Sequence, residues 1–380
     1  MSNSQIYLDV TQTVARAKSG IETVATSIAR ALPPENLLVW EGGVFRHAAK
    51  SELQKVNVTK GINSKQSMNS SKVRFPTGST ILLPEIISDT QQILWLRENI
   101  DSRAIRIVCM VYDLLPLSNP DMFPDFVLEK FLNFMHFARK CDQVIFCSAD
   151  TKASFELWEK FAASSGFRQF GNRQRLSTVN LPSVHDTGKC QKTVKAVSNK
   201  EVRILQVGNF DPRKNLEFTL DVCRAIVATG RKVKLDLVGG NSWKMDTFFH
   251  QLKESKSRNL VVRVEHNLPD DALEKLWLTA DLSLYFSHAE GFGLPISESL
   301  FRGIPVVCSN NLPAFKGNIS PHLWGVEPGK LDLALKKALI ALSHGKCVEV
   351  NARVRGKFQM EASWYDYGEQ VLKLAKSENT

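Results

Sequence analysis

The chain has 380 residues, 43% of them hydrophobic and 23% charged, and this balance excludes global disorder. This length exceeds that of an ordinary domain with a single hydrophobic core and therefore favours two domains. Lysine and arginine outnumber aspartate and glutamate by 49 to 39, which gives a net charge of +10. This charge indicates either an anionic partner, such as a nucleotide or a phospholipid surface, or a solvated basic surface.

The sequence contains no signal for membrane insertion, metal binding or nucleic-acid recognition. No apolar run reaches the length of a spanning helix, and the opening residues MSNSQIYLDV lack a basic segment followed by an apolar one. The seven cysteines and the histidines show no metal-ligand spacing, and no nucleic-acid-binding motif occurs. We therefore expect a cytoplasmic protein with free thiols, no metal, no cofactor and no nucleic-acid partner.

The first half alternates between strand-like and helix-like segments. Apolar runs typical of buried strands are QIYLDV, NLLVWEG, STILLPE, RIVCMVYDL and DQVIFCSAD. Apolar residues at helical spacing follow the first run, after a loop that contains Gly20, and follow the last run in TKASFELWEKFA. Residues 46–80 are rich in Ser, Asn and Lys with little periodicity, so we expect a long mobile loop there.

A second cycle begins after residues 186–200, which lose the apolar pattern and are interpreted as a linker. Strands are expected in VRILQVG, VKLDLVGG, DLSLYFS and PVVCS, and helices in NLEFTLDVCRAIVATG, DDALEKLWLTA and PISESLFRG. This alternation predicts an α/β fold with two Rossmann-like domains, at residues 1–185 and 201–362, facing each other across a cleft. Residues 363–380 are expected to form an amphipathic helix that crosses back to brace the first domain.

Two carboxylates flank a Gly-Phe-Gly-Leu-Pro turn in SHAEGFGLPISESLFRGIPVVCS. Pro295 suits the first turn of a helix, so Glu290 is placed in a loop at the carboxyl end of a strand and Glu298 in the first helical turn. Ligands bind at this edge of parallel sheets, where a helix N-terminus favours phosphate and carboxylates accept hydrogen bonds from hydroxyl groups. A nucleotide-sugar would use all of these features; the alternative is a tight turn in which Glu298 serves only the helix dipole.

A second motif, VGNFDPRKN at residues 207–215, follows the first strand of the same domain. Arg213 and Lys214 are therefore expected at the same sheet edge, where a planar guanidinium and an ammonium suit a diphosphate leaving group. The alternative is a solvated pair of cations at the start of a helix.

Together, VGNFDPRKN and EGFGLPISE with its Glu-x7-Glu spacing resemble the pattern of glycosyltransferase family four, which consists of retaining, nucleotide-sugar-dependent enzymes of GT-B fold. SGIETV, YDLLPLSNPDMF, VIFCSADTKASFELW and SWYDYGEQVL are similar to its bacterial surface-polysaccharide branch. The resemblance implies a retaining, metal-independent hexosyltransferase that moves mannose from GDP-mannose to a saccharide acceptor, lipid-linked, in surface polysaccharide or lipopolysaccharide biosynthesis. A non-catalytic nucleotide- or sugar-binding protein of the same fold is the alternative.

The resemblance also implies roles for individual residues. Glu290 would bind hydroxyls of the donor sugar, Glu298 would bind the ribose, and Arg213 with Lys214 would hold the diphosphate. Further donor contacts are expected from Gly20, Gly208, Asn209, Gly291, Phe292, Gly293, Leu294, Val264, His266 and Asn267. The chain departs from relatives at Tyr112, where many have His, and at Asn209, where some have Arg.

The acceptor side is defined less sharply. Asp113, at the end of a first-domain strand, is the candidate for contact with the acceptor or the donor sugar; the alternative is a loop-capping Asp. Residues 123–140 interleave aromatic and aliphatic side chains with basic ones, and with Arg16 and Lys18 they could seat the first domain on anionic lipid at the inner face of the cytoplasmic membrane. A buried core helix with a basic end explains the same residues.

Overall fold

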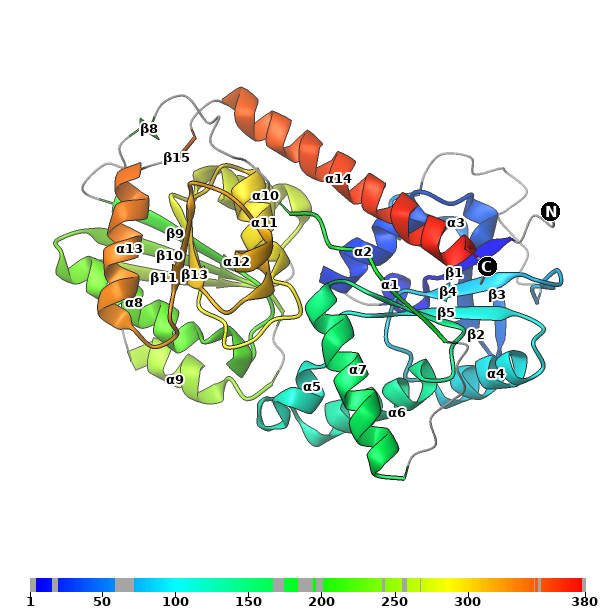
Figure 1. Ribbon diagram of the computed structural model, residues 1–380. Helices are drawn as coiled ribbons and strands as arrows, with labels where there is room; N and C mark the ends of the chain where they lie inside the picture. Colours follow the sequence, from blue (N-terminus) through cyan, green and yellow to red (C-terminus); the bar gives the residue numbers. More distant parts are fainter. Residues whose placement is uncertain are drawn as a thin grey trace. The chain divides into compact units, whose positions relative to one another are not determined.

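The computed structural model describes residues 5–15, 20–58, 72–166, 174–183, 194–195, 201–240, 243–254, 258–266, 268–344, 346–347 and 350–377. The chain divides into two compact units, one made of Met1–Leu181 with Ala362–Thr380 and the other of Pro182–Glu361 (Figure 1). The linker expected at residues 186–200 lies outside the described residues, apart from a short strand at its centre, β8 (Val194–Lys195).

The first unit is built on a seven-stranded sheet in the order β3-β2-β1-β4-β5-β6-β7, parallel except for the β2–β3 pair. The strands are β1 (Ile6–Asp9), β2 (Leu37–Glu41), β3 (Val44–His47), β4 (Thr80–Leu83), β5 (Arg106–Val111), β6 (Gln143–Phe146) and β7 (Arg175–Thr178). The helices are α1 (Thr11–Ala15), α2 (Gly20–Ala29), α3 (Lys50–Lys55), α4 (Thr90–Asp101), α5 (Leu115–Ser118), α6 (Asp125–Ala138) and α7 (Ala149–Ser164), with 3-10 turns at Pro34–Asn36 and Pro120–Met122. Strands β1, β4 and β6 are buried along their whole length, which explains their continuous apolar sequences.

The second unit has a six-stranded parallel sheet in the order β11-β10-β9-β12-β13-β14. The strands are β9 (Glu201–Val207), β10 (Lys232–Val238), β11 (Leu260–Glu265), β12 (Leu282–Tyr285), β13 (Val306–Ser309) and β14 (Leu323–Val326). The helices are α8 (Leu216–Ala228), α9 (Asp246–Glu254), α10 (Asp270–Thr279), α11 (Leu294–Phe301), α12 (Pro313–Gly317) and α13 (Leu331–His344), with a 3-10 turn at Pro212–Lys214; β8 pairs with β15 (Lys346–Cys347). The predicted α/β architecture with two Rossmann-like units is thus confirmed.

Helices cover both faces of the second sheet. Ile204 of β9 packs in a core with buried residues of α8, α9 and α13, whereas its neighbour Leu205 packs with Trp277 of α10 on the other face. The strand order reverses between β9 and β12, because the chain adds strands outward from β9 and then outward from β12. In open α/β sheets the carboxyl edge at such a reversal is the usual ligand-binding position.

The last helix, α14 (Val350–Lys376), begins in the second unit and ends in the first (Figure 1). Trp364, Tyr367 and Val371 are buried within the first unit. Gly368 packs so tightly that a Cβ there would lie 2.5 Å from the backbone oxygen of Ser27 on α2. The prediction that the C-terminal helix returns to the first domain is confirmed.

Residues 46–80, which the sequence predicts as one long loop, contain α3 within their described part. The guanidinium of Arg46 on β3 forms two bonds of 2.8 Å to the carboxylate of Glu52, which also accepts a hydrogen bond from the backbone N–H of Ala49. Polar capping, rather than an apolar stripe, therefore starts this helix, and a search for hydrophobic periodicity does not detect it. Residues 59–71 lie outside the described part.

Candidate functional site

The turn that follows Glu290 packs against α12. Gly293 adopts φ = +103°, a left-handed conformation that favours glycine, and precedes the first residue of α11, Leu294. A Cβ on Gly293 would lie 3.2 Å from Cβ of Ala314 in α12. The buried Phe292 accepts a hydrogen bond of 2.8 Å at its carbonyl from the Ala314 N–H. The backbone from Gly291 to Leu294 is therefore held against α12 where β12 leads into α11.

Glu290 and Lys214 form an ion pair between the two sequence motifs. The Lys214 Nζ lies 2.5 Å from Glu290 Oε1, and only 14% and 12% of the two side chains are exposed. The Ser287 hydroxyl donates a hydrogen bond of 2.7 Å to the same carboxylate oxygen. Burial alone would raise the pKa of Glu290, but the positive charges of Lys214 and Arg213 and the two hydrogen bonds outweigh it and hold that pKa below its usual value. Glu290 is therefore a carboxylate at neutral pH.

Close backbone packing positions the loop after β9. Gly208 has φ = +145°, and a Cβ there would lie 3.4 Å from Cε of Lys214, so the lysine stem passes directly over this glycine. A Cβ on Gly239, at the end of β10, would lie 2.0 Å from the carbonyl oxygen of Gly208. Phe210 N–H donates to the Gly240 carbonyl at 2.8 Å. The paired glycines of VKLDLVGG thus let the two loops touch.

Asp211 is a residue of the site that the sequence reading did not single out. Its carboxylate accepts bonds from Arg213 at Nε (3.0 Å), Nη2 (2.8 Å) and the backbone N–H (3.1 Å), and only 1% of its side chain is exposed. The Arg213 carbonyl in turn accepts a hydrogen bond of 2.7 Å from the His288 N–H, which joins the two motif loops. The Asp-Pro sequence before Arg213 was the available signal, because Asp is a preferred cap at a helix start.

Glu298 lies on α11 in a different electrostatic setting. Its half-buried carboxyl has a pKa raised above the usual value, first by burial and then by Glu274, with Arg302 acting in the opposite direction. Arg302 donates to the Glu298 carbonyl at 3.0 Å and forms an ion pair with Glu274 at 2.9 Å. The pKa values of the two carboxyl groups of the Glu-x7-Glu motif are therefore shifted in opposite directions, downward for Glu290 and upward for Glu298.

The residues expected to contact the base of the nucleotide lie at the carboxyl end of β11. Val264 is in β11, and the His266 Nδ1 lies 2.9 Å from the Gly239 carbonyl oxygen. The His266 ring packs edge-on against Phe210 at 5.3 Å. These contacts place His266 beside the loop of Gly208 and Asn209, whereas Asn267 lies outside the described residues.

Gly20 and Asp113 belong to the first unit, and the other candidate residues belong to the second. Gly20 is the first residue of α2. Asp113 Oδ1 accepts a hydrogen bond of 3.0 Å from the Leu115 N–H, as a loop-capping Asp does. The Tyr112 hydroxyl donates to the Pro84 carbonyl at 2.6 Å, and burial raises its pKa well above the usual value. Tyr112 is therefore held within the first unit by a hydrogen bond to the residue that follows β4.

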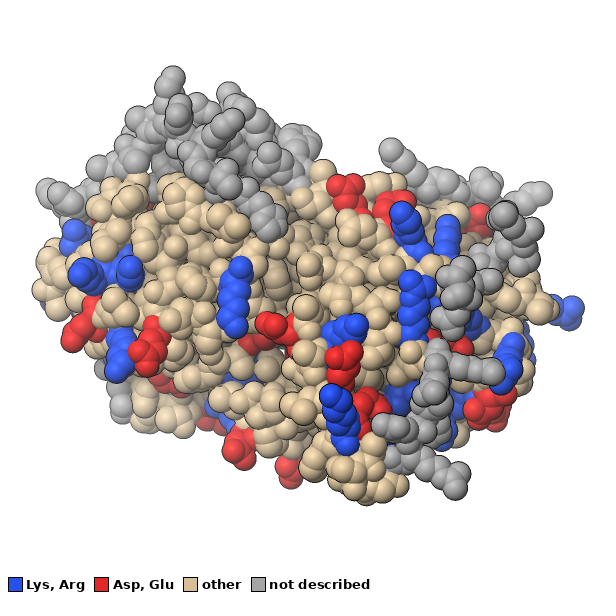
Figure 2. Space-filling view, in the orientation of Figure 1, with Lys and Arg blue, Asp and Glu red and all other residues tan. Residues whose placement is uncertain are grey.

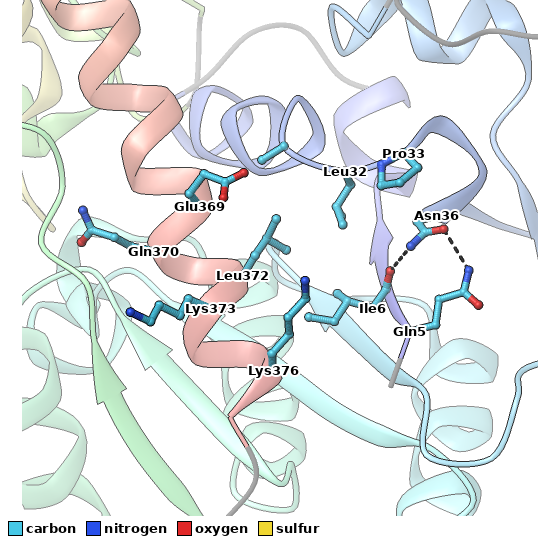
Figure 3. A pocket seen from close by; sticks show the side chains of 11 residues that line it. Gln5, Ile6, Leu32, Pro33, Asn36, Glu369, Gln370, Leu372, Lys373 and Lys376 are labelled. Atoms are coloured by element: carbon cyan, nitrogen blue, oxygen red, sulfur yellow. Dashed lines mark hydrogen bonds between the residues drawn. The ribbon is translucent and has the colours of Figure 1, made fainter. Parts of the chain in front are cut away.

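A pocket of ≈ 760 Å³ in the first unit holds none of these candidate residues (Figure 3). It lies where β1 begins, between the end of α2 and the last turns of α14, and Figure 3 shows Asn36 bonded to Gln5 and to the Ile6 carbonyl. Ligands of parallel sheets bind at the opposite, carboxyl edge. The pocket is therefore not the site that the motifs define.

The described residues show neither a metal-binding cluster nor a membrane-spanning helix. No group of three or more His, Cys, Asp or Glu side chains among them is arranged to hold a metal ion. None of the helices in the described part of the chain is both long and apolar enough to cross a bilayer. On the face shown in Figure 2, basic and acidic side chains are interspersed.

Two Rossmann-like units, with two motif loops meeting at the carboxyl edge of the second sheet, define the GT-B class of glycosyltransferases. Residues 191–355, which lie within the second unit, match the family of glycosyl transferases group 1, and this match bears out the resemblance noted in the sequence.

Similar proteins support the same assignment. The chain is 25% identical over 275 residues to the serotype-specific mannosyltransferase WbdA of Escherichia coli, covering 70% of this chain and 33% of that protein. It is 32% identical over 176 residues to the O-antigen chain mannosyltransferase B of Escherichia coli, covering 45% of each. The chain thus spans about a third of the length of WbdA.

Solved structures with the same fold cover the whole chain. Anabaena HepE, in complex with UDP and glucose, superimposes with a TM-score of 0.62 at 15% identity over 99% of this chain and 100% of that one. A trehalose-6-phosphate synthase gives a TM-score of 0.58 at 12% identity, with the same coverage. At these identities the likeness establishes the GT-B fold alone.

Proposed function

We propose that this chain is a catalytically active, retaining mannosyltransferase. It transfers mannose from GDP-mannose to a saccharide acceptor, lipid-linked, in the biosynthesis of a surface polysaccharide or lipopolysaccharide. The observation that carries the proposal is the meeting of Arg213, Lys214 and Glu290 at the carboxyl edge where the strand order reverses. The choice of mannose follows the two Escherichia coli relatives, both of which are mannosyltransferases.

Each part of the donor has a partner of suitable chemistry in the second unit. Lys214 and Arg213 bind the diphosphate, together with backbone N–H groups of residues 291–294 at the start of α11. Glu290 accepts hydrogen bonds from hydroxyls of the sugar, and Glu298 accepts them from the ribose. The base of the nucleotide lies near Val264 and His266, at the carboxyl end of β11.

Transfer breaks the bond between the anomeric carbon and the diphosphate and forms a bond from that carbon to an acceptor oxygen on the same face. The leaving phosphate takes the acceptor proton. Lys214, Arg213 and the N-terminus of α11 stabilise the negative charge that develops on the diphosphate, which is the main electrostatic requirement of this step. Because protein cations supply this charge, the reaction needs no divalent metal. Asp113, from the first unit, contacts the acceptor or the donor sugar.

The acceptor is lipid-linked in this proposal, and the enzyme acts in the cytoplasm at the inner face of the membrane. Four large apolar residues of α6 are buried, as expected of a core helix, but Phe126 is 56% and Leu132 is 39% exposed. Lys130 lies over the Phe126 ring at 5.8 Å. These three residues are the candidate contact with anionic lipid.

A thermal-shift panel tests the donor site. GDP, UDP and dTDP and their mannose, glucose and rhamnose conjugates are compared with and without EDTA, on the wild type and on Lys214→Ala and Glu298→Ala. A nucleotide at 100 times its Kd stabilises the protein by about 2.7 kcal/mol, and we expect this shift for GDP and GDP-mannose, unaffected by EDTA and lost in both variants. Lys275→Ala, on a side chain of α10 that is 76% exposed, is the matched control and should retain the shift.

The panel also separates the alternatives. No shift with any nucleotide would reject the transferase proposal, and a shift with UDP or dTDP alone would reject GDP-mannose as donor. A nucleotide shift without turnover on a panel of mannosides would favour the non-catalytic alternative. Where turnover occurs, the anomeric configuration of the product, read by NMR, decides whether the enzyme is retaining.

A further inference from the structure

In the proposed function, Lys214 and Glu290 serve different parts of the donor, yet they contact each other. The ammonium lies 2.5 Å from the carboxylate, and both side chains are at least 86% buried. A diphosphate needs the same ammonium that Glu290 holds, and a sugar hydroxyl needs the same carboxylate that Lys214 holds. The inference below rests on the proposed function, because it asks how these two demands are reconciled.

A nucleoside diphosphate and a nucleotide-sugar differ in what they offer to Glu290. Both bring negative charge to Lys214 and therefore compete with the carboxylate for it. Only the nucleotide-sugar also brings hydroxyl donors, which can satisfy the carboxylate once the ammonium has moved to the phosphates. With a nucleoside diphosphate, Glu290 loses the ammonium to the phosphates and gains no hydroxyl in its place, so it is left as a buried carboxylate without its counterion, which is unfavourable.

The neighbouring cation does not play the same part. Arg213 is held by two side-chain bonds to Asp211, whose side chain is 1% exposed and which the proposed function does not use as a ligand. Lys214 therefore differs from Arg213, because its anionic partner is itself a group that binds the donor. Ser287, which donates at 2.7 Å to Glu290 Oε1, keeps the carboxylate in place when the ammonium leaves.

We propose that Glu290 makes the site prefer nucleotide-sugar over free nucleoside diphosphate and thereby promotes product release. Glu290 and the diphosphate compete for Lys214, and the hydroxyls of the bound sugar relieve this competition. After transfer the sugar has left, Glu290 has lost its hydroxyl partners, and it takes Lys214 back from the diphosphate. The ion pair is thus a specificity device in addition to its contact with the sugar.

Calorimetric titration of GDP and UDP, each with its mannose or glucose conjugate, tests this on the wild type, Glu290→Gln, Lys214→Met and the double variant. We expect Glu290→Gln to bind the free diphosphate about tenfold more tightly, the scale of one charge-assisted hydrogen bond, without any gain for the conjugate. In the Lys214→Met background the same substitution should change the affinity less than about twofold. Glu298→Gln, in the same motif, is the matched control and should not tighten diphosphate binding.

The outcomes distinguish failure of the inference about Glu290 from failure of the proposed function. Unchanged or weaker diphosphate binding by Glu290→Gln, with measurable binding by the wild type, would overturn the inference and leave the proposed function intact. Equal tightening in the Lys214→Met background would also overturn it, because the effect would then be general electrostatics. No binding of any nucleotide by the wild type would instead overturn the proposed function. Thermal unfolding of each variant confirms that it is folded.

Discussion

Asp211 is a buried carboxylate whose ionic partner is Arg213. Replacing Asp211 with Asn removes the carboxylate that binds a guanidinium only 15% exposed. We expect the free energy of unfolding to fall by about 2 kcal/mol, because a buried charge that loses its partner keeps its desolvation cost. Urea unfolding monitored by tryptophan fluorescence measures the change.

A second Asp–Arg pair in the same unit provides the control. Asp221 and Arg224 on α8 lie 2.8 Å apart but are 48% and 44% exposed, so Asp221→Asn should change the free energy of unfolding by less than about 0.5 kcal/mol. Similar losses in both variants would show that burial does not distinguish the two pairs.

The two carboxylates of the Glu-x7-Glu motif should have opposite effects on stability. The pKa of Glu290 is held below its usual value, so its ionised form stabilises the folded state, and this contribution is lost as the pH falls below about 4. The pKa of Glu298 is raised by burial, so its ionised form destabilises the folded state above that raised value. We therefore expect Glu290→Gln to lower the free energy of unfolding at pH 7 and Glu298→Gln to raise it.

Unfolding curves of the wild type and both variants between pH 7 and pH 3 check these signs. Both differences should shrink as the pH falls, because each carboxyl then becomes neutral in the wild type as it is in the variant. Differences of the same sign at pH 7 would contradict the distinct environments of the two residues.

At the scale of the elements, the contact between the ends of β9 and β10 sets the position of Lys214. Gly239→Ala would place a Cβ 2.0 Å from the Gly208 carbonyl oxygen, and backbone cannot rotate out of the way. The two loops must separate, which should cost about 1–3 kcal/mol in stability and weaken nucleotide binding about tenfold or more. Thermal unfolding and calorimetric titration of GDP measure the two effects.

Gly240→Ala is the matched control, one residue further along. The atom nearest to its new Cβ would be Oδ1 of the exposed Asn209 side chain, 3.3 Å away, which can move. This variant should keep nearly all of the nucleotide affinity. If Gly239→Ala behaved like Gly240→Ala, the close approach of the two loops would not control the site.

Several strands that the sequence predicted have continuous apolar runs, such as RIVCMV in β5 and VVC in β13, because strands buried on both faces need them. Helix α9 was not among the predicted helices, although Phe248, Phe249 and Leu252 lie at helical spacing and pack on the core. Helix α3 was missed because it depends on the bonds of Glu52. Both motif loops were correctly expected at the carboxyl edge, because strand direction fixes that edge.

What single-sequence reasoning could not supply is which charged side chains pair. Lys214 and Glu290 are 76 residues apart in the chain, and their contact depends on the register of β9 against β12 and on Gly208 beneath the lysine stem. Arg213 was expected to hold only the diphosphate, whereas its guanidinium also binds Asp211. Such pairings follow from three-dimensional packing, which residue type and spacing do not encode.

At the scale of the whole molecule, α14 makes the first unit depend on the last residues of the chain. Arg106, at the start of β5, donates to the Ala375 carbonyl, and Arg175, at the start of β7, donates to the Ser377 carbonyl at 3.0 Å. Gly368→Val would force side-chain atoms into the backbone of Ser27, so the helix must lift from α2. We expect a loss of about 2–3 kcal/mol in the first unit, which exceeds the roughly 0.5 kcal/mol gained from the better helix propensity of valine.

Hydrogen exchange followed by mass spectrometry can assign this loss to one unit. Amides of residues 5–181 should lose protection in Gly368→Val, whereas those of residues 201–344 should not, because the two units have separate cores. GDP affinity should stay within about twofold while the proposed mannose transfer falls, since Asp113 and Gly20, to which the proposal gives roles in the reaction, lie in the weakened unit. Gln370→Val, at an exposed position of the same helix, should leave both unchanged. A parallel loss of GDP affinity in Gly368→Val would mean that the donor site depends on the first unit for its stability as well as for catalysis.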